Sequence, residues 1–205
     1  MKENSKTYSR LLKTGISLAR SKGLEGFNIR ELCSKAGVNL GVFHYYFKSR
    51  ENFNNIVFKT IYSDIAGKIR LDISLDNSPR ENFAYMLKHI SVSACENKAL
   101  FASLIKDMIN GNKNVRKVVE QNVSETVNMM LRGLDRSKKL GIIIDADKLN
   151  LFSMLVLPVV MPHIFTGFAG KAGFSGFGGI FGKGTVIKTD EAIDLALNSV
   201  FKNKA

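Results

Sequence analysis

The stretch that most constrains this chain is residues 28–50, where polar caps, a glycine and two short helical patterns follow one another. Asn28 is suited to cap a first short helix, Gly37 to form the left-handed turn after it, and Asn39 to cap a second helix. The spacing of apolar residues gives both helices one inward face, made of Ile29, Leu32, Cys33, Ala36, Phe43 and Phe47. Residues 28–50 therefore predict a helix-turn-helix, whose second helix keeps its outward face for a DNA groove.

The charge of the chain fits such a motif. The net charge is +12, and the sequence pI is about 9.7. Residues 1–60 hold 11 Lys or Arg and only 4 Asp or Glu, so the positive charge is concentrated around residues 28–50. A basic protein of this kind is suited to a polyanion or to an acidic membrane surface.

Apolar residues recur at intervals of three and four along the rest of the chain, and no stretch alternates in the way that a strand requires. We therefore expect an all-α protein of about nine helices. Ser49, Pro79 after Ser78, and Asp145 are expected to begin later helices. The length favours a small and a larger unit, which we place at residues 1–48 for DNA binding and 49–205 for a helical ligand-binding and dimerisation domain.

Compartment is indicated by the two cysteines and by the N-terminus. Cys33 lies on the inward face of a short helix and Cys95 is far away in sequence, so a disulfide framework is not expected. The first residues lead into a charged helix without an apolar signal core. Both features favour a cytoplasmic protein.

Residues 149–170 contain no Asp, Glu, Lys or Arg. This uncharged stretch is about as long as a membrane span. Pro158 and Pro162 argue against a span, because each frees a backbone group that lipid would leave unsatisfied. The preferred interpretation is a helix covered by its own domain and by a partner subunit. A membrane-associated protein anchored by these residues remains the alternative.

Residues 167–184 hold eight of the 17 glycines together with four phenylalanines. No regular structure is expected there. A flexible loop is the preferred interpretation, and an arm or lid that docks on a partner or over a pocket is the other.

Enzymatic chemistry is not indicated. His44, His89 and His163 lie in separate expected helices without an acidic or cysteine partner at motif spacing, so no catalytic, metal or cofactor site is predicted. His89 is either a surface or core histidine or a polar group facing a ligand cavity.

The N-terminal stretch resembles the DNA-binding domain of the TetR (tetracycline-repressor-like) transcriptional regulators over about residues 8–55. The residues that carry the resemblance are Leu11, Leu12, Gly15, Leu18, Gly23, Leu32, Cys33, Ala36, Gly37, Val38, Asn39, Gly41, Phe43, His44, Tyr46, Phe47, Lys48, Ser49, Arg50 and Glu51. The family usually has Ala at positions 15 and 33, Ser or Thr at 28 and 39, and Tyr at 44. The tyrosine of the family contacts phosphate, and an imidazole at His44 is expected to donate the same bond.

The residues expected to contact DNA lie at the helix starts and on the outward face of the second helix. They are Asn28, Arg30, Asn39, Leu40, Val42, His44, Tyr45 and Lys48. Leu40 and Val42 offer only apolar contact to bases, so direct readout should be modest and DNA shape should contribute.

One such domain makes few contacts, so a homodimer on a palindromic operator is expected. Residues 149–165 and 189–201 are the candidate interface, and the family resemblance implies the same pair of helices. The middle helices would enclose a pocket for a small, largely apolar effector, lined by Phe58, Tyr62, Tyr85, Met86, His89, Phe101, Ile105, Met108, Val127, Met130 and Phe152. The predicted function is a ligand-released transcriptional repressor; a small-molecule-binding helical protein is a further alternative.

Overall fold

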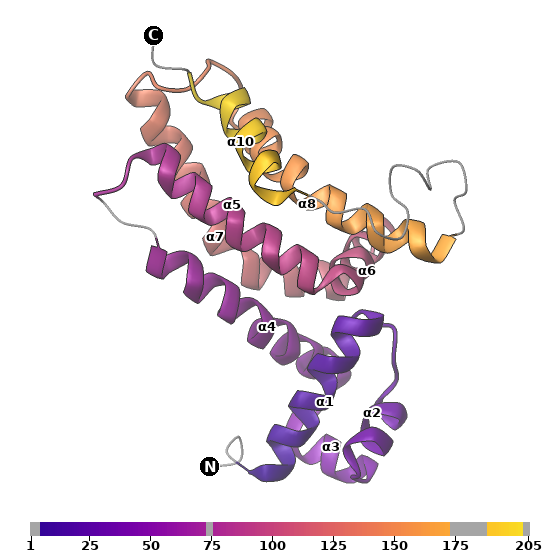
Figure 1. Cartoon of the computed structure of the whole chain (residues 1–205). Helices are drawn as coiled ribbons and strands as arrows, with labels where there is room; N and C mark the ends of the chain where they lie inside the picture. Colours follow the sequence, from indigo (N-terminus) through magenta and orange to yellow (C-terminus); the bar gives the residue numbers. More distant parts are fainter. Residues whose placement is uncertain (1–4, 73–75, 173–187, 203–205) are drawn as a thin grey trace. The chain divides into compact units, whose positions relative to one another are not determined.

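The computed structural model describes residues 5–72, 76–172 and 188–202, and these residues form nine helices (Figure 1). The helices are α1 (Lys6–Lys22), α2 (Ile29–Ala36), α3 (Leu40–Phe47), α4 (Arg50–Asp72), α5 (Pro79–Glu96), α6 (Lys98–Ile109), α7 (Lys113–Lys139), α8 (Lys148–Ala172) and α10 (Thr189–Val200). Over the described ranges the only strand-like pairing is one isolated antiparallel bridge between Ile143 and Phe201. The all-α prediction is confirmed.

The chain divides into two compact units. Unit 1 consists of residues 1–64 and 97–122, and unit 2 consists of residues 65–96 and 123–205. Helices α4 and α7 therefore each contribute one part to each unit.

Helix starts in unit 1 follow the capping residues that the sequence indicates. The side-chain oxygens of Asn28, Asn39 and Ser49 accept hydrogen bonds from backbone N–H groups three residues ahead, at 2.8, 3.0 and 3.1 Å. Each bond satisfies one of the N–H groups that a helix start leaves without a partner. In unit 2, Ser78 and Glu81 bond reciprocally to each other's N–H groups, which is a capping box at the start of α5.

The start of α8 differs from the prediction. Asp145 does not cap it but pairs with Lys138 at 2.7 Å. Asp147 caps the helix instead, because its Oδ1 accepts from the N–H of Leu149 at 2.8 Å. Asp145 and Asp147 are both suitable caps, and the turn before α8 places Asp147 at the start of the helix.

The end of α8 also differs from the prediction. The helix continues to Ala172, so the first residues of the Gly/Phe-rich segment 167–184 are helical rather than irregular. Helix propensity is a weak preference, and a glycine costs only about 1 kcal/mol inside a helix that other residues sustain. Residues 173–184 lie outside the described residues.

Unit 2 is built on the mutual packing of α5, α8 and α10, which run beside one another in Figure 1. Leu87, Leu155 and Leu197 are almost fully buried where these helices meet. A polar group lies in the same core: His163 Nε2 is 2.8 Å from Ser91 Oγ, and both residues are buried.

Candidate nucleic-acid interface

The framework of the helix-turn-helix is apolar and closely packed. Leu32, Cys33 and Ala36 of α2 and the two phenylalanines of α3 are buried, as the spacing predicts, and only Ile29 is half-exposed. Gly37 adopts φ 61° and ψ 44°, a left-handed conformation that glycine takes without a steric penalty. The turn therefore holds α3 against α2 while leaving the opposite face of α3 uncovered.

The uncovered face of α3 consists of the residues that the sequence places outward. Leu40 is 43% exposed and Tyr45 is 50% exposed, His44 is exposed, and Val42 is half-buried. Leu40 and Tyr45 are five residues apart and are not direct neighbours on the helix, but both side chains are accessible to a partner. The outward-facing side chains of α3 are mainly apolar or aromatic, with few groups able to pair with base edges.

Asn28 and Asn39 use one side of their amide groups within the protein. In each case Oδ1 accepts a backbone hydrogen bond, and the side chain is exposed. The amide nitrogen is then the atom that remains for an acceptor such as a phosphate oxygen. Arg30, in the first turn of α2, is exposed as well.

His44 has a narrower role than its sequence position suggests. Its Nδ1 lies 3.2 Å from the carbonyl oxygen of Lys48, so Nδ1 carries the proton and donates it. Because this bond engages Nδ1, Nε2 is the ring nitrogen that remains for a contact with DNA.

Lys48 lies at the C-terminal end of α3, one residue before the Ser49 cap of α4. Its φ is 64°, and it is the one non-glycine residue with positive φ among the described residues. Such a backbone is uncommon for a lysine and lets the chain change direction sharply between α3 and α4. The exposed ammonium group is thereby carried at the junction of the two helices.

Helix α1 also packs against α3 and the turn that precedes it. Ser5 Oγ donates to Tyr46 Oη at 2.7 Å, and the ring of Tyr8 stacks on Phe47 with centroids 5.0 Å apart. At the turn, Arg10 Nη2 lies 3.5 Å from the carbonyl oxygen of Gly37. The first turns of α1 are thus anchored along α3.

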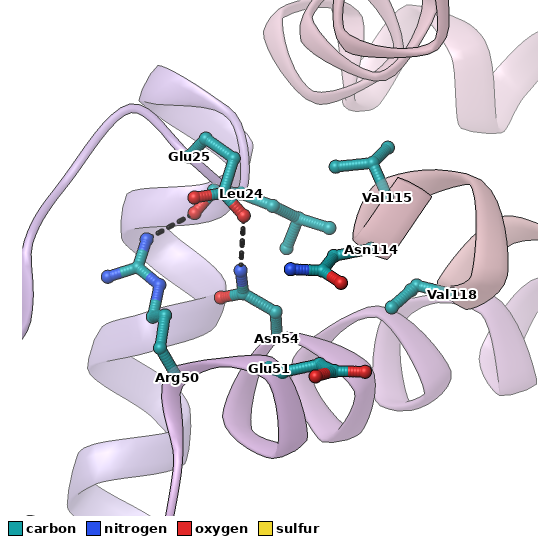
Figure 2. Close-up of a pocket in the computed structure, with 8 residues that line it drawn as sticks. All are labelled: Leu24, Glu25, Arg50, Glu51, Asn54, Asn114, Val115 and Val118. Carbon is teal, nitrogen blue, oxygen red and sulfur yellow. Dashed lines mark hydrogen bonds between the residues drawn. The ribbon is translucent and has the colours of Figure 1, made fainter. Parts of the chain in front are cut away.

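The start of α4 is tied to the connector between α1 and α2, as Figure 2 shows. Arg50 donates to the carbonyl of Leu24, and its guanidinium lies over the ring of Phe27, 4.2 Å from the centroid. Asn54 donates to Glu25 at 2.8 Å. Burial lowers the pKa of the Arg50 guanidinium, which the Glu25 carboxylate partly opposes, and an arginine stays charged throughout.

These connector contacts are not indicated by the sequence. Arg50 and Asn54 are visible there only as members of a helical pattern, and no residue spacing links them to residues 23 to 29 positions earlier. Next to Arg50 and Asn54 on α4, Glu51 lies 3.5 Å from Lys117 and Asn55 accepts from Asn122 at 3.1 Å. The first two turns of α4 are therefore held both by the connector and by α7.

A small cavity of about 110 Å³ lies beside this anchor (Figure 2). Its walls come from the connector and from the starts of α4 and α7, and they consist of Leu24, Glu25, Arg50, Glu51, Asn54, Asn114, Val115 and Val118. None of the residues expected to line an effector pocket is among them.

The residues expected to line an effector pocket are distributed over both units. Phe58, Tyr62, Phe101, Ile105 and Met108 belong to unit 1, and Tyr85, Met86, His89, Val127, Met130 and Phe152 belong to unit 2. Phe58, Met86 and Met130 are buried, Tyr85 and Met108 are exposed, and the others are half-buried.

No group of three His, Cys, Asp or Glu residues suited to a metal ion occurs among the residues that the structure describes. Both cysteines are free thiols; Cys33 is buried and Cys95 is exposed. Burial raises the pKa of the Cys33 thiol, which favours an inert, uncharged side chain.

Comparison with known proteins identifies the N-terminal domain. Residues 11–53 match the family model described as bacterial regulatory proteins, tetR family. This match assigns the helix-turn-helix domain, residues 11–53, to the TetR family. The resemblance seen in the sequence is therefore confirmed for this domain. Proteins of the TetR family are DNA-binding transcriptional regulators rather than enzymes.

Solved structures of several regulators share the fold over almost the whole chain. A protein from Shewanella sp. PV-4 described as a tetR family transcription regulator has 13% identity and a TM-score of 0.68, over 97% of this chain and 100% of that one. The fatty acid degradation regulator FadR from Bacillus halodurans has 13% identity and a TM-score of 0.70, over 95% and 96%. A Clostridium perfringens protein described as a fatty acid metabolism regulator has 18% identity and a TM-score of 0.71, over 95% and 100%. A comparison with curated protein sequences gave no match.

Proposed function

We propose that this chain is a cytoplasmic, homodimeric transcriptional repressor that leaves a palindromic operator when a small, largely apolar effector binds. The observation that carries the proposal is the exposed aromatic and apolar face of α3 on a basic TetR helix-turn-helix. A single such face reads few bases, so adequate affinity asks for two faces on successive major grooves.

In the proposed complex, backbone and base contacts have different sources. Asn28, Asn39 and Lys48 donate to phosphates, and Arg30 adds a polar contact at the start of α2. Leu40 and Val42 touch thymine methyl groups, and Tyr45 and His44 reach phosphates or bases. None of the four residues proposed to reach the bases makes the bidentate pairs that Arg or Asn make, so DNA shape should carry part of the specificity.

The proposed dimer interface is formed by α8 and α10. Only 28% of Lys148–Phe165 is buried inside the protein, although its mean hydropathy is 1.5. Large apolar side chains remain exposed on these helices, namely Leu149, Leu157, Phe165 and Leu195. A second copy of the same surface would cover them, as two-fold symmetry allows.

The same exposed helix favours the alternative of membrane association, since it is long and apolar enough to cross a bilayer. Fractionation separates the two. The dimer proposal requires a soluble particle of about twice the 22.7 kDa chain mass, and recovery with membranes that high salt does not release would support the anchor instead.

The effector is proposed to bind among the middle helices, in contact with the eleven residues named for that pocket. Preferential binding to a DNA-incompetent arrangement would shift the population away from the operator-bound state. The α4 helix is the proposed link, because the connector and α7 both hold its first turns. A helical small-molecule-binding protein without a DNA role would bind the same ligands and enrich no DNA.

Selection of duplexes from a random pool tests the function directly. The wild-type chain should enrich a palindrome at low salt, and failure to enrich any would contradict the proposal. Lys48→Ala should weaken binding to all sequences and flatten the salt dependence, because it removes one phosphate contact per subunit. Lys106→Ala, which removes an exposed lysine from α6, is the matched control and should leave the salt slope unchanged.

A further inference from the structure

Helix α1 is positively charged along its whole length and contains no acidic residue. Lys6–Lys22 includes five Lys or Arg and no Asp or Glu. Lys6 and Arg10 are exposed and one turn apart, so they share one face. Within the described part of the chain neither has a carboxylate partner, whereas Lys22 and Lys35 both pair with Glu31.

The face formed by Lys6 and Arg10 lies at the end of α1 that is anchored to the reading helix. Ser5, which caps α1 directly before Lys6, is bonded to Tyr46 in the C-terminal half of α3. Arg10 reaches the Gly37 carbonyl, two residues before the Asn39 cap of α3. The two cations therefore lie close to both ends of α3.

We propose that Lys6 and Arg10 contact phosphates of the DNA backbone next to the half-site that α3 reads. The proposal rests on the proposed DNA-binding function and extends its contact surface to α1. Unpaired cations beside a groove-reading helix match the charge of the phosphodiester chain. One Arg10 N–H bonds to Gly37, and a guanidinium has five N–H donors, so donors remain for phosphate.

An ordinary solvated charged face is the alternative, and the salt dependence of binding separates the two. Removing a cation that neutralises one phosphate lowers the steepness of log K against log salt by about 0.9. A dimer carries each cation twice, so removal of both side chains leaves four phosphates without a counter-charge and flattens the slope by roughly 3 to 4. Cations on a solvated face leave the slope nearly unchanged, because their interaction with DNA is screened.

The test uses the full-length chain and a duplex that the wild type has enriched from a random pool. Lys6→Gln with Arg10→Gln should flatten the salt slope and weaken binding to all duplexes equally, without changing the preferred sequence. Arg132→Gln with Lys139→Gln removes the same charge from exposed positions of α7 and should keep the wild-type slope. Lys6→Arg with Arg10→Lys should also keep the slope, since both charges remain.

Three results would overturn the proposal: a wild-type slope in the glutamine variant, an equal flattening in the α7 variant, or a flattened slope in the charge-conserving variant. The last result would mean that Arg10 acts by holding the Gly37 turn through its hydrogen bond and not by neutralising a phosphate. Failure of the wild type to enrich any duplex would instead contradict the proposed function. Thermal unfolding of each variant shows that α1 and α3 remain packed.

Discussion

Replacement of Gly15 in α1 by alanine should destabilise the protein, although the same change in most helices stabilises it. Inside a helix, Gly→Ala ordinarily stabilises by up to about 1 kcal/mol. Here the added Cβ would lie 2.3 Å from Cζ and 2.9 Å from Cε1 of Phe53. The ring cannot simply move away, because it is fully buried with its centroid 4.8 Å from that of Phe47 and 5.3 Å from that of Phe43.

Overpacking of a close-packed core costs about 1–3 kcal/mol, and a contact this short belongs at the upper end. After subtraction of the helix gain, Gly15→Ala should lower the free energy of unfolding by about 2 kcal/mol. For a chain of this length that corresponds to a fall in Tm of about 4–8 °C. Thermal unfolding followed by circular dichroism at one fixed protein concentration measures this fall, since the proposed dimerisation would make Tm depend on concentration.

Gly67 of α4 provides the matched control. It is helical and exposed, and a Cβ there would meet nothing within 4 Å. Gly67→Ala should therefore raise Tm by about 2–4 °C, the opposite sign. If Gly15→Ala raised Tm as Gly67→Ala does, the packing argument would be refuted. Adding Gly15→Ala to Phe53→Leu should cost far less than adding it to the wild type, which is the signature of direct coupling.

Three further predictions concern the cap, the ion pair and the proposed interface. Asn39→Ala should lower the free energy of unfolding in urea by about 1 kcal/mol, because it removes the cap of α3. Asn39→Asp should keep the cap yet weaken DNA binding, because a carboxylate replaces the amide donor and repels phosphate. Equal DNA affinity in Asn39→Asp would remove this residue from the phosphate contacts. The bond from Lys22 lowers the pKa of the Glu31 carboxyl, so the stability that this ion pair contributes is present above the unfolded-state pKa and is lost as pH falls through the lower folded-state pKa. Glu31→Gln should therefore flatten the acid side of a profile of Tm against pH, below about pH 4.5. An unchanged profile would count against this ion pair. Leu157→Glu should convert the proposed dimer to a monomer in size-exclusion chromatography. Leu140→Glu changes an equally exposed leucine just after α7 and should not; a Leu157→Glu dimer would place the interface elsewhere.

The helix caps and the contacts between elements differ in how far the sequence could reveal them. The caps Asn28 and Asn39 act on residues three positions ahead, so short-range spacing was sufficient to predict them. The bond from Arg50 to Leu24 joins residues 26 positions apart, and the choice of Asp147 over Asp145 depended on how the preceding turn folds. The hydrogen bonding of His44 could not be predicted either, because its Nδ1 bonds to the Lys48 carbonyl, which only the turn into α4 places nearby.

The sequence by itself determined the all-α class, the helix-turn-helix, its buried aromatic core and the outward face of α3. These follow from periodicity and capping, which are local properties of a helix and survive without knowledge of what packs against it. Only the tertiary structure decided that Ser5 and Arg10 bond to Tyr46 and to the Gly37 carbonyl, that Phe53 occupies the space over Gly15, and that the connector holds the start of α4. These are contacts between elements, and their energies depend on relative positions that no residue spacing encodes.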